Sequence, residues 1–365
     1  MTTTIDNEQK TLNVPNLRFP EFEGEWQENY VNEICNEFKS GKAIKADLIL
    51  DVGTYPVFGG NGLRGYTSTY NHDGLFVLIG RQGALCGNVR SVIGKTYITE
   101  HAIAVNGNNK SDTNFLHYLF LQMDLGRFSD QSAQPGLAVN KLLKLKVITP
   151  RIDEQRKIAN LLRLLDERIA TQNKIIEDLK KLKSAISDRL FKNIKGDVIT
   201  LSEICDIVKG KQINGEYLTE SGEYYVMNGG TEPSGYYGDY NVDANTISIS
   251  EGGNSCGYVQ FNTSPFWSGG HCYSIQNIAD HVDNLYLYHY LKSNEEVIMR
   301  LRIGSGLPNI QKKDLTMFKI KVPTFEQQIT ISTFLSSLER KAEIEERIQN
   351  VILKQKLYLL QQMFI

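Results

Sequence analysis

DEQRKIANLLRLLDERIATQNKIIEDLKKLKSAISDRLF, residues 153–191, is a stretch without glycine or proline. Alternate steps of four and three residues from its first isoleucine meet an apolar side chain at eight of ten positions. The ten positions are Ile158, Leu162, Leu165, Ile169, Gln172, Ile176, Leu179, Lys183, Ile186 and Leu190. This spacing predicts a helix about 60 Å long with a heptad seam. A single helix cannot bury such a seam, so the fold needs a second long helix.

A second seam of this kind runs to the end of the chain, and seven of its ten positions are apolar. They are Ile331, Leu335, Leu338, Ala342, Glu345, Gln349, Ile352, Lys356, Leu359 and Met363. We expect antiparallel pairing, since parallel helices would require the intervening chain to travel back along the first helix. Gln172 and Gln349 would then lie near the middle of the pair. They either fix the register as buried polar residues or remain partly exposed.

The chain contains an internal duplication. VNEICNEFKSGK from Val31 matches LSEICDIVKGKQ from Leu201, and IGRQGALCGNV from Ile79 matches ISEGGNSCGYV from Ile249, both at an offset of 170. Beyond residue 121 the offset becomes 173, and it stays so to the end of the second seam. A period this long indicates two copies of a whole domain, each followed by one long helix, rather than a solenoid.

Each globular copy is rich in glycine, tyrosine and β-branched residues, with short alternating runs typical of strands between turns. We therefore predict an α+β fold with two similar globular domains, at residues 1–150 and 196–322. Two long antiparallel helices, at residues 151–195 and 323–365, separate them as a coiled-coil-like spacer. The copies are expected to be related by a pseudo-twofold axis.

Composition indicates a folded soluble chain, with 41% hydrophobic and 22% charged residues. No apolar run approaches the roughly 20 residues that a membrane helix needs. The first residues are polar and contain no apolar signal core, so we expect a cytoplasmic protein. The five cysteines include no CxxC pair and are interpreted as small buried side chains.

Motifs of catalysis are absent from the sequence. IGKT at residues 93–96 has the end of a Walker A loop, but Val89 stands where the first glycine should be. The sequence contains no H-E-x-x-H, no G-x-S-x-G, and neither the N-P-P-[YF] nor the D-P-P-Y motif of amino-methyltransferases. For the matched pair His101 and His271, a structural role is favoured over a ligand or base. We expect a non-catalytic chain that binds no metal or cofactor itself.

Two further motifs carry a resemblance to a known family. PNLRFPEFEGEWQENYVNEICNEFKSGK near the N-terminus, and P-x-I-x-E-Q-x-x-I at Pro150–Ile158 before the long helix, resemble the specificity subunits of type I restriction–modification systems. The second copy reads PTFEQQITI at Pro323–Ile331 and departs from the family pattern at Gln327, where glutamate is usual, as at Glu154. The resemblance covers nearly the whole chain.

This resemblance implies that each globular part is a target-recognition domain that reads one half of a split double-stranded DNA sequence. The helices would set the distance between the half-sites and dock two modification (methyltransferase) subunits. Those subunits would bind S-adenosylmethionine and methylate adenine, and restriction subunits that translocate and cut DNA can join them. Two different domains on one scaffold would read an asymmetric target, whereas a homodimer reads a palindrome. The alternatives are a two-domain scaffold that does not bind DNA and an enzyme in its own right.

The charge distribution is unusual for a DNA-binding chain. Residues 1–150 hold 14 Lys and Arg against 15 Asp and Glu, and residues 196–322 hold 9 against 15. The helical segment 151–195 is basic, with 12 against 7, and residues 323–365 hold 5 against 5. Because DNA affinity normally depends on phosphate neutralisation, we expect the partner subunits to supply most of the positive charge. The isolated chain should then bind DNA weakly.

Polar positions that differ between the copies are candidates for reading different bases. In the repeated loop, Arg81-Gln82 stands where the second copy has Glu251-Gly252. Arginine suits a guanine edge, glutamine an adenine edge and glutamate a cytosine amino group. The candidates are Arg64, Arg81, Gln82, Asn88 and Arg90 in the first copy, and Tyr236, Tyr237, Glu251, Asn254 and Gln260 in the second. The alternative is that these are ordinary solvated loop residues.

A second matched pair of loops, SDQSAQPG from Ser129 and RIGSGLPN from Arg302, precedes the strand that leads to each long helix. Serine, glycine and asparagine with exposed backbone N–H groups suit phosphate or sugar contacts. The candidates here are Arg127, Gln131, Ser132, Gln134, Arg302, Ser305 and Asn309. A β-turn without a ligand is the alternative.

Overall fold

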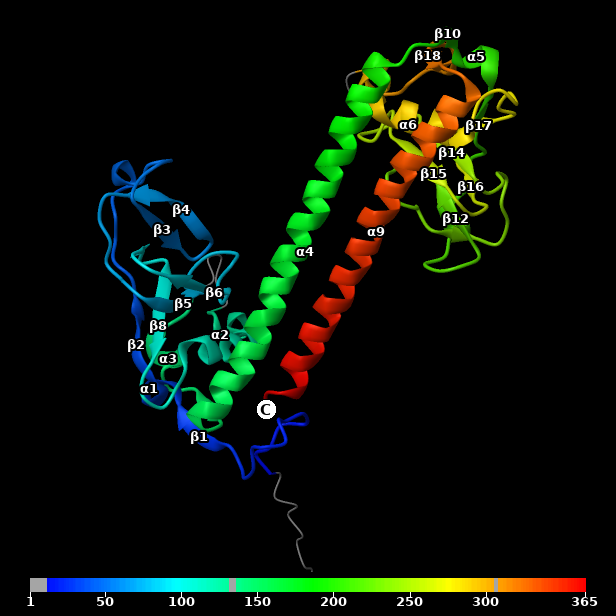
Figure 1. Ribbon diagram of the computed structural model, residues 1–365. Coiled ribbons are helices and arrows are strands. Elements are labelled where there is room, and N and C mark those ends of the chain that lie inside the picture. Colours follow the sequence, from blue (N-terminus) through cyan, green and yellow to red (C-terminus); the bar gives the residue numbers. More distant parts are fainter. Residues whose placement is uncertain (1–11, 131–135, 305–307) are drawn as a thin grey trace, which may run out of the picture. The chain divides into compact units, whose positions relative to one another are not determined.

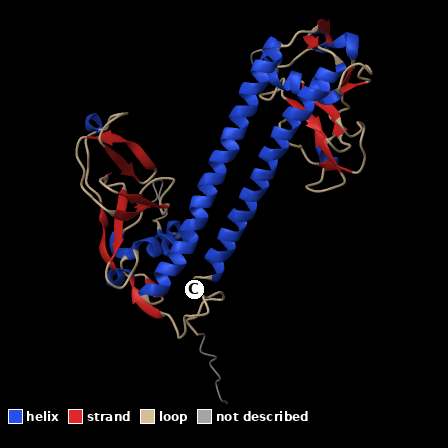
Figure 2. Ribbon diagram, viewed as in Figure 1, coloured by secondary structure: helices blue, strands red, loops and turns tan. Residues whose placement is uncertain are grey.

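The computed structural model describes residues 12–130, 136–304 and 308–365 (Figure 1). The chain divides into two compact units, of which the first comprises Met1–Gln172 and Ile348–Ile365 and the second Asn173–Arg347. Each unit therefore holds one globular part and one half of each long helix. Figure 2 shows that the strands lie in the globular parts and that neither long helix is interrupted.

The first unit contains three small sheets and several short helices. Its four-stranded antiparallel sheet has the order β2 (Cys35–Ser40), β8 (Ala102–Gly107), β5 (Leu75–Gly80), β6 (Val89–Ile93). Its other strands are β4 (Gly62–Thr67), β3 (Tyr55–Gly59) and β7 (Tyr97–Ile98) in one sheet, and β1 (Gln27–Tyr30) and β9 (Lys146–Thr149) in another. Its helices are α1 (Val31–Ile34), α2 (Thr113–Gln122) and α3 (Val139–Leu142), with 3-10 turns η1 (Ala46–Leu48) and η2 (Leu125–Phe128).

The second unit repeats this arrangement strand for strand. Its four-stranded sheet has the order β11 (Asp206–Lys209), β17 (Cys272–Gln276), β14 (Thr246–Ser250), β15 (Val259–Asn262). Its three-stranded sheet has the order β13 (Tyr236–Tyr237), β12 (Tyr224–Met227), β16 (Trp267–Ser268). Strands β10 (Asp197–Thr200) and β18 (Lys319–Val322) form the third sheet. Its helices are α5 (Leu201–Ile204), α6 (Asn284–Ser293), α7 (Glu295–Met299) and α8 (Lys312–Thr316), with the 3-10 turn η3 (Gly215–Tyr217). The α+β class is confirmed in both copies.

Helices α2 and α6 begin in the same way. Asp112 caps α2 by accepting a hydrogen bond from the backbone N–H of Phe115, and Asp283 caps α6 through that of Tyr286. Glutamine side chains at the start of the long helices hold both caps. Gln155 Oε1 accepts a hydrogen bond from the backbone N–H of Asp112, and Gln328 Oε1 accepts one from that of Asp283, each at 2.9 Å. The copies thus use one buried glutamine to fix a globular part to its long helix.

Helices α4 (Ile152–Asn193) and α9 (Phe325–Gln362) contain the two predicted seams. All twenty seam positions are buried or half-buried. The hydrophobic residues singled out for the coiled coil are among them: Ile158, Leu162, Leu165, Ile169, Ile176, Leu179, Ile331, Leu335, Leu338, Ile352 and Leu359. Gln172 is 1% exposed and Gln349 is half-buried. The heptad spacing therefore identifies the protected face of both helices.

The direction of pairing follows from the cores. In the first unit Leu162, near the start of α4, shares a core with Leu360 at the end of α9. In the second unit Phe191, at the end of α4, shares a core with Leu335 near the start of α9. The start of each helix thus lies with the end of the other, so the helices are antiparallel, as expected.

Lysines in the seams make matched ion pairs between the helices. Lys183 Nζ lies 2.7 Å from Glu339 Oε1 in the second unit, and Lys356 pairs with Asp166 in the first. A tyrosine from the globular part also donates to each carboxylate, Tyr288 to Glu339 at 2.9 Å and Tyr118 to Asp166 at 2.8 Å. The half-buried lysines thus find a carboxylate within reach.

Gln327 has a structural explanation for its departure from the family pattern. Its counterpart Glu154 is 1% exposed and receives two hydrogen bonds of 2.8 Å from the Arg18 guanidinium and one of 3.3 Å from Trp26 Nε1. Arg18 and Trp26 belong to the segment before β1. Gln327 is exposed, because the second copy is preceded by the end of α4 instead.

Candidate nucleic-acid interface

The loop after β5 is a tight turn held by its own backbone. Gly80 N–H donates to Asn88 O at 2.8 Å, and Gly87 N–H donates back to Gly80 O at 2.8 Å. The Cys86 thiol points inward to Arg81 O at 3.2 Å. Gly87 has φ +88°, and a Cβ there would lie 2.2 Å from the backbone nitrogen of Gly126. Only glycine fits this position without strain.

The loop after β14 repeats these bonds. Ser250 N–H donates to Tyr258 O at 2.9 Å, Gly257 N–H donates to Ser250 O at 2.8 Å, and the Cys256 thiol lies 3.0 Å from Glu251 O. Gly257 also has a positive φ, +90°. The shared glycines and cysteines are therefore structural features of one turn, and the nucleotide-loop appearance of the sequence has this origin.

Three predicted arginines of the first copy have atoms close to the β3–β4 hairpin turn. A Cβ on Gly59 would lie 2.9 Å from Arg64 Cδ, one on Gly60 would lie 3.5 Å from Arg81 N, and one on Gly62 would lie 2.3 Å from Arg90 Nη1. Gln82 forms a bridge with Gly136, and its Oε1 lies 3.0 Å from Nδ1 of His101. The side chains of Arg64 and Arg90 bring positive charge to this turn, and Arg81 approaches it with its backbone nitrogen.

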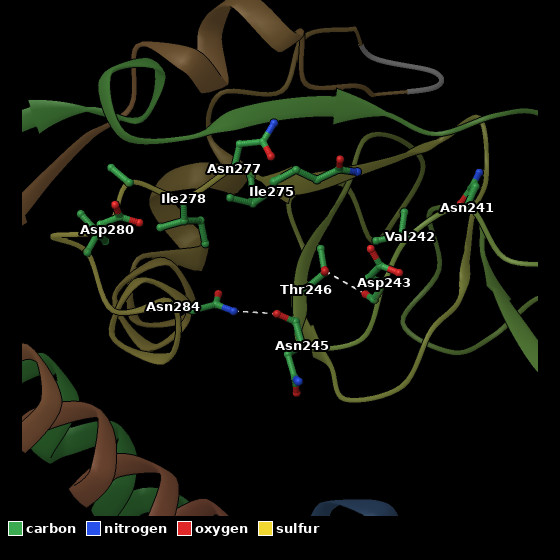
Figure 3. A pocket seen from close by; sticks show the side chains of 13 residues that line it. Asn241, Val242, Asp243, Asn245, Thr246, Ile275, Asn277, Ile278, Asp280 and Asn284 are labelled. Carbon is green, nitrogen blue, oxygen red and sulfur yellow. Dashed lines mark hydrogen bonds between the residues drawn. The ribbon is translucent and has the colours of Figure 1, made fainter.

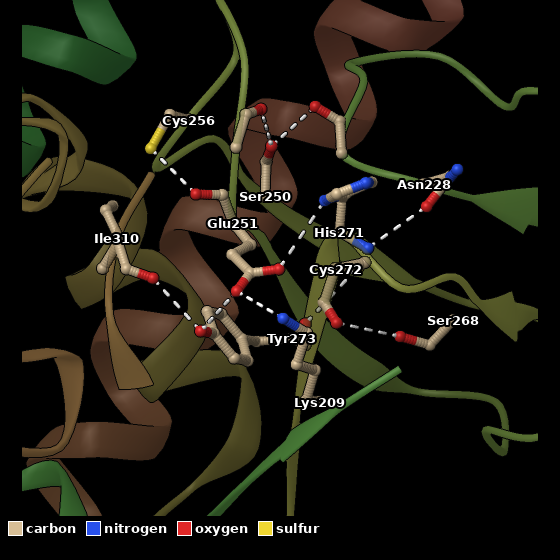
Figure 4. A network of polar contacts seen from close by, with 12 residues as sticks. Lys209, Asn228, Ser250, Glu251, Cys256, Ser268, His271, Cys272, Tyr273 and Ile310 are labelled. Atoms are coloured by element: carbon tan, nitrogen blue, oxygen red, sulfur yellow. Dashed lines mark hydrogen bonds and ion pairs between the residues drawn. The ribbon is translucent and has the colours of Figure 1, made fainter. Parts of the chain in front are cut away.

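The matching corner of the second copy holds a different group, shown in Figure 4. Glu251 Oε1 accepts from Lys209 Nζ at 2.7 Å and from the Tyr273 hydroxyl at 3.0 Å. Glu251 Oε2 lies 3.8 Å from His271 Nδ1. Tyr273 shares its one hydroxyl proton between Glu251 and Ile310 O, which lies 3.1 Å away. Burial and, after it, the bond to Glu251 raise the pKa of Tyr273. The carboxylate anchors a polar network.

This network corrects the expectation for Glu251. The residue is only 7% exposed, and its Oε2 is buried without a hydrogen-bond partner among the described residues. Its other oxygen is occupied by Lys209 and Tyr273. Glu251 is therefore not the exposed carboxylate that the sequence predicted as an acceptor for a cytosine amino group. The exposed members are Lys209 and His271, whose side chains are 53% and 62% exposed.

Sequence matching missed Lys209 because of a bulge. Strand β2 has an irregularity between Cys35 and Glu37, which β11 lacks. As a result Ser40 pairs with Ile103 in the first copy, where Lys209 pairs with Tyr273 in the second. Lys39, which the offset of 170 aligns with Lys209, pairs instead with the next residue of β8 and lies on the opposite face of the sheet.

Glycines could have revealed this shift. Gly41 and Gly210 both follow these strands and pack against matched backbone atoms, Ile98 O at 2.2 Å and Ser268 O at 2.4 Å from their ideal Cβ positions. Aligning the two glycines gives an offset of 169 and places Lys209 opposite Ser40. The missed signal was thus a one-residue gap after Cys35.

The remaining candidates of the second copy are spread over several elements. Tyr236 and Tyr237 form β13, where Tyr237 packs edge-on against Trp267 at 5.1 Å between ring centroids. Asn254 is exposed at the tip of the repeated loop. Gln260 lies on β15 with a buried Oε1 that has no partner among the described residues. In the first copy, Asn88 lines a pocket against the end of α2.

The second loop pair is described only in part. Gln131, Ser132, Gln134 and Ser305 lie outside the described residues. Arg127, Arg302 and Asn309 are exposed. Asn309 forms bridges with Ile303 and with Gly252 of the repeated loop, as Gly136 does with Gln82 in the first copy. The two predicted loops therefore lie side by side in both copies.

A polar pocket of about 460 Å³ lies elsewhere in the second unit (Figure 3). Asn284 Nδ2 donates to Asn245 O at 2.6 Å across it, and the Oδ1 of Asn284 is buried without a partner among the described residues. The lining contains two aspartates but, within the part of the chain described, neither lysine nor arginine. It adjoins the start of β14, whereas Glu251 follows the end of that strand. Its charge does not suit a phosphate.

The cysteines and histidines show no reactive grouping. Burial raises the pKa of Cys35 and Cys205 to about 12 and that of Cys272 to about 11, which keeps these thiols protonated. His101 and His271 lie beside the repeated loops, where His101 is half-buried and His271 is exposed, and the structural role expected for this pair stays a prediction. Across residues 12–130, 136–304 and 308–365, no cluster of His, Cys, Asp and Glu could hold a metal ion, and no helix could span a membrane.

A duplicated α+β scaffold whose matched loops carry different polar groups is typical of a recognition protein. The sequence matches the family described as type I restriction modification DNA specificity domain, over residues 23–181 and again over residues 193–354. The chain belongs to this family.

Relatives have the same description. A 173-residue match, 39% identical, is found with the specificity subunit of the type I restriction enzyme EcoprrI of Escherichia coli, and it covers 46% of this chain and 42% of that protein. A putative type I specificity subunit of Mycoplasma genitalium is 32% identical over 43% of each chain. The chain thus matches less than half of the length of these two relatives. A putative specificity subunit of Haemophilus influenzae is 23% identical over 87% of this chain and 88% of its own.

The fold is also known from a crystal structure. The S subunit of a type I restriction–modification system from M. genitalium superposes with a TM-score of 0.78, covering 96% of this chain and 99% of that one at 21% identity. The duplicated α+β architecture with two long helices is therefore that of a solved specificity subunit.

Proposed function

We propose that this chain is the DNA-specificity subunit of a type I restriction–modification complex. Each globular part reads one half of a bipartite double-stranded DNA target. The antiparallel helices set the distance between the half-sites. The chain itself performs no chemistry and binds no cofactor, and two methyltransferase subunits bring S-adenosylmethionine and methylate adenine.

One observation carries this proposal. The two copies build the same turn from the same hydrogen bonds, yet Arg81 and Glu251 occupy its matched position. A structural turn would need no such difference, because its backbone is held by glycine and by the inward thiol. A protein that reads two different half-sites needs a constant frame and variable polar groups.

The helices support the docking of partner subunits. Apolar side chains that the seam does not use remain exposed on α9. They include Val351, Leu357 and Tyr358 in the first unit, and Phe325, Phe334 and Ile344 in the second. These side chains offer apolar surface that a partner protein can bury. We place the methyltransferase subunits on these faces, and restriction subunits would join the assembled complex.

Charge determines how tightly the chain binds alone. The second globular part has six more acidic than basic residues, and the first is nearly balanced. Because non-specific affinity follows the number of neutralised phosphates, the isolated chain should bind duplex DNA weakly at near-physiological salt. Filter binding or anisotropy with and without the methyltransferase subunit measures this. Tight sequence-specific binding by the chain alone would contradict this assignment of charge.

The proposal is tested by expressing the chain with its methyltransferase partner and mapping adenine methylation across a genome. We expect one split motif, with a fixed number of unread bases between its halves. Replacing residues 1–150 with the corresponding domain of another specificity subunit should change one half only. Absence of any methylation motif, with both proteins folded and associated, would overturn the proposed function.

A further inference from the structure

We propose that Lys209 is a base-reading residue of the second half-site, with Glu251 and Tyr273 as the residues that position it. The inference rests on the proposed function and names the group through which the second copy recognises DNA. Lysine can donate to the O6 and N7 acceptors of guanine in the major groove. A guanine is therefore the base that we assign to this side chain.

The geometry fixes the lysine while leaving its charge accessible. Glu251 takes one hydrogen bond from Lys209 Nζ at 2.7 Å, and the lysine side chain remains 53% exposed. An ammonium group has three donors, so the others are free to meet a base edge. Glu251 is itself held by Tyr273, whose hydroxyl shares its one proton between Glu251 and Ile310 O. A flexible side chain thereby acquires a defined direction, which discrimination between bases requires.

Three replacements between the copies are linked through Glu251. The first copy has Ser40, Arg81 and Ile103 at the structural positions of Lys209, Glu251 and Tyr273. A buried glutamate without a lysine and a hydroxyl beside it would cost free energy, whereas the Tyr273 hydroxyl, which shares its one proton between Glu251 and Ile310 O, would keep the carbonyl as an acceptor. The three residues therefore form one hydrogen-bonded network rather than three independent surface changes.

Each copy has a cationic residue at or beside the repeated loop, but the residue comes from a different element. In the first copy Arg81 stands in the loop itself, and no side-chain partner for it is found among the described residues. In the second copy the loop contributes a carboxylate, and the cation comes from β11. Since groups that differ between the copies are those suited to reading sequence, the lysine on its carboxylate is the second copy's counterpart of Arg81.

The experiment uses the full chain bound to its methyltransferase subunit and compares methylation motifs. We expect Lys209→Gln to relax one position of the second half-site, with about 10- to 100-fold weaker discrimination there, and to leave the first half intact. Lys209→Arg should retain the motif. Lys39→Gln is the matched control, because this lysine is also exposed but lies on the opposite face, and it should change nothing.

Positioning by Glu251 has its own readout. Glu251→Gln should relax the same position as Lys209→Gln, and the double variant should be no worse than Lys209→Gln alone. A purely structural glutamate would lower the melting temperature but leave the motif unchanged. If Lys209→Gln abolishes methylation, restoration by Lys209→Arg supports the inference, and failure to restore it overturns the inference.

The two possible failures are distinguishable. If the unaltered complex yields a split motif and Lys209→Gln leaves both halves unchanged, Lys209 reads nothing and the inference is wrong. If the unaltered complex yields no motif at all, the proposed function fails first, and the inference falls with it.

Discussion

The loops at residues 80–88 and 250–258 share a backbone and differ in chemistry. Both close with the same hydrogen bonds, including that of the thiol that points into the turn. One carries a half-buried arginine, whereas the other buries a glutamate that holds a lysine from a neighbouring strand. The comparison teaches that, in this fold, the backbone of the turn and the polar side chains it carries can vary independently. Because glycines and backbone hydrogen bonds hold the turn, it tolerates a complete change of polar side chain.

The largest difference between the copies is expected at their attachment to the long helices. Glu154→Ala leaves the Arg18 guanidinium and the Trp26 indole N–H without their buried acceptor, and should lower the free energy of unfolding by about 3–5 kcal/mol. Gln327→Ala, at the matched exposed position, should change it by less than about 0.5 kcal/mol. Denaturant unfolding of both variants measures this. Equal effects would show that the N-terminal segment does not anchor the first copy.

The next largest effect tests the shared frame. Gly87→Ala introduces a Cβ at positive φ and 2.2 Å from backbone, and should cost about 2–4 kcal/mol. Gly257→Ala should cost less, because its closest contacts, with Met299, are 2.9–3.0 Å rather than 2.2 Å. Thermal unfolding compares the two, with Gly83→Asn as a control that has open space around its Cβ. A larger loss for Gly257→Ala would contradict the structural comparison.

Acid should destabilise both copies through one histidine in each of the helices α2 and α6, although the two histidines stand at different positions of these helices. Burial lowers the pKa of His117 and of His289 to about 4, so each is neutral in the folded chain. Between pH 6.5 and 4 the unfolded chain binds more protons, and stability falls as pH falls through this window. Each histidine should cost about 2 kcal/mol at pH 5 relative to neutral pH.

Variants of these histidines separate the two copies. His117→Leu removes an Nδ1 that is buried without a partner among the described residues, and should flatten the acid limb of a stability–pH curve. His289→Gln should flatten it by a similar amount while keeping a donor near Ser336 Oγ, which lies 2.8 Å from the ring. Curves as steep as that of the unaltered chain would show that these histidines do not control acid unfolding.

The smallest expected stability effect belongs to the loop itself. Arg81→Gln should change the free energy of unfolding by less than about 0.5 kcal/mol, since no partner within the described chain depends on the guanidinium. The same variant should alter the first half of the methylation motif and leave the second unchanged. An altered second half would show that the copies do not read independently.

Much of the fold could be predicted from the sequence because its signals are periodic. The heptad spacing identified the protected face of both long helices, and the repeated motifs identified two copies of one domain. The candidate site was less accessible, because burial is not visible in a loop motif. Glu251 looked like an exposed acid, and only its neighbours Lys209 and Tyr273, from two other strands, show that it is an internal anchor.

Strand register explains the rest of what was missed. Lys39 and Lys209 align in sequence, but one extra residue in β2 turns them to opposite faces. A constant offset cannot detect this, because the surrounding motifs match on both sides of the insertion. The polar pocket beside Asn284 was also not expected, since its lining comes from several separate turns.

The bulge in β2 has a consequence for how such proteins diversify. Inserting one residue into a strand exchanges its outward and inward side chains over the following stretch, while both ends of the strand stay attached to the same neighbours. A three-nucleotide insertion or deletion in the gene could therefore retune which bases a domain reads in one step. Evolution by codon insertion would change the side chains that a domain presents to DNA and leave its fold intact.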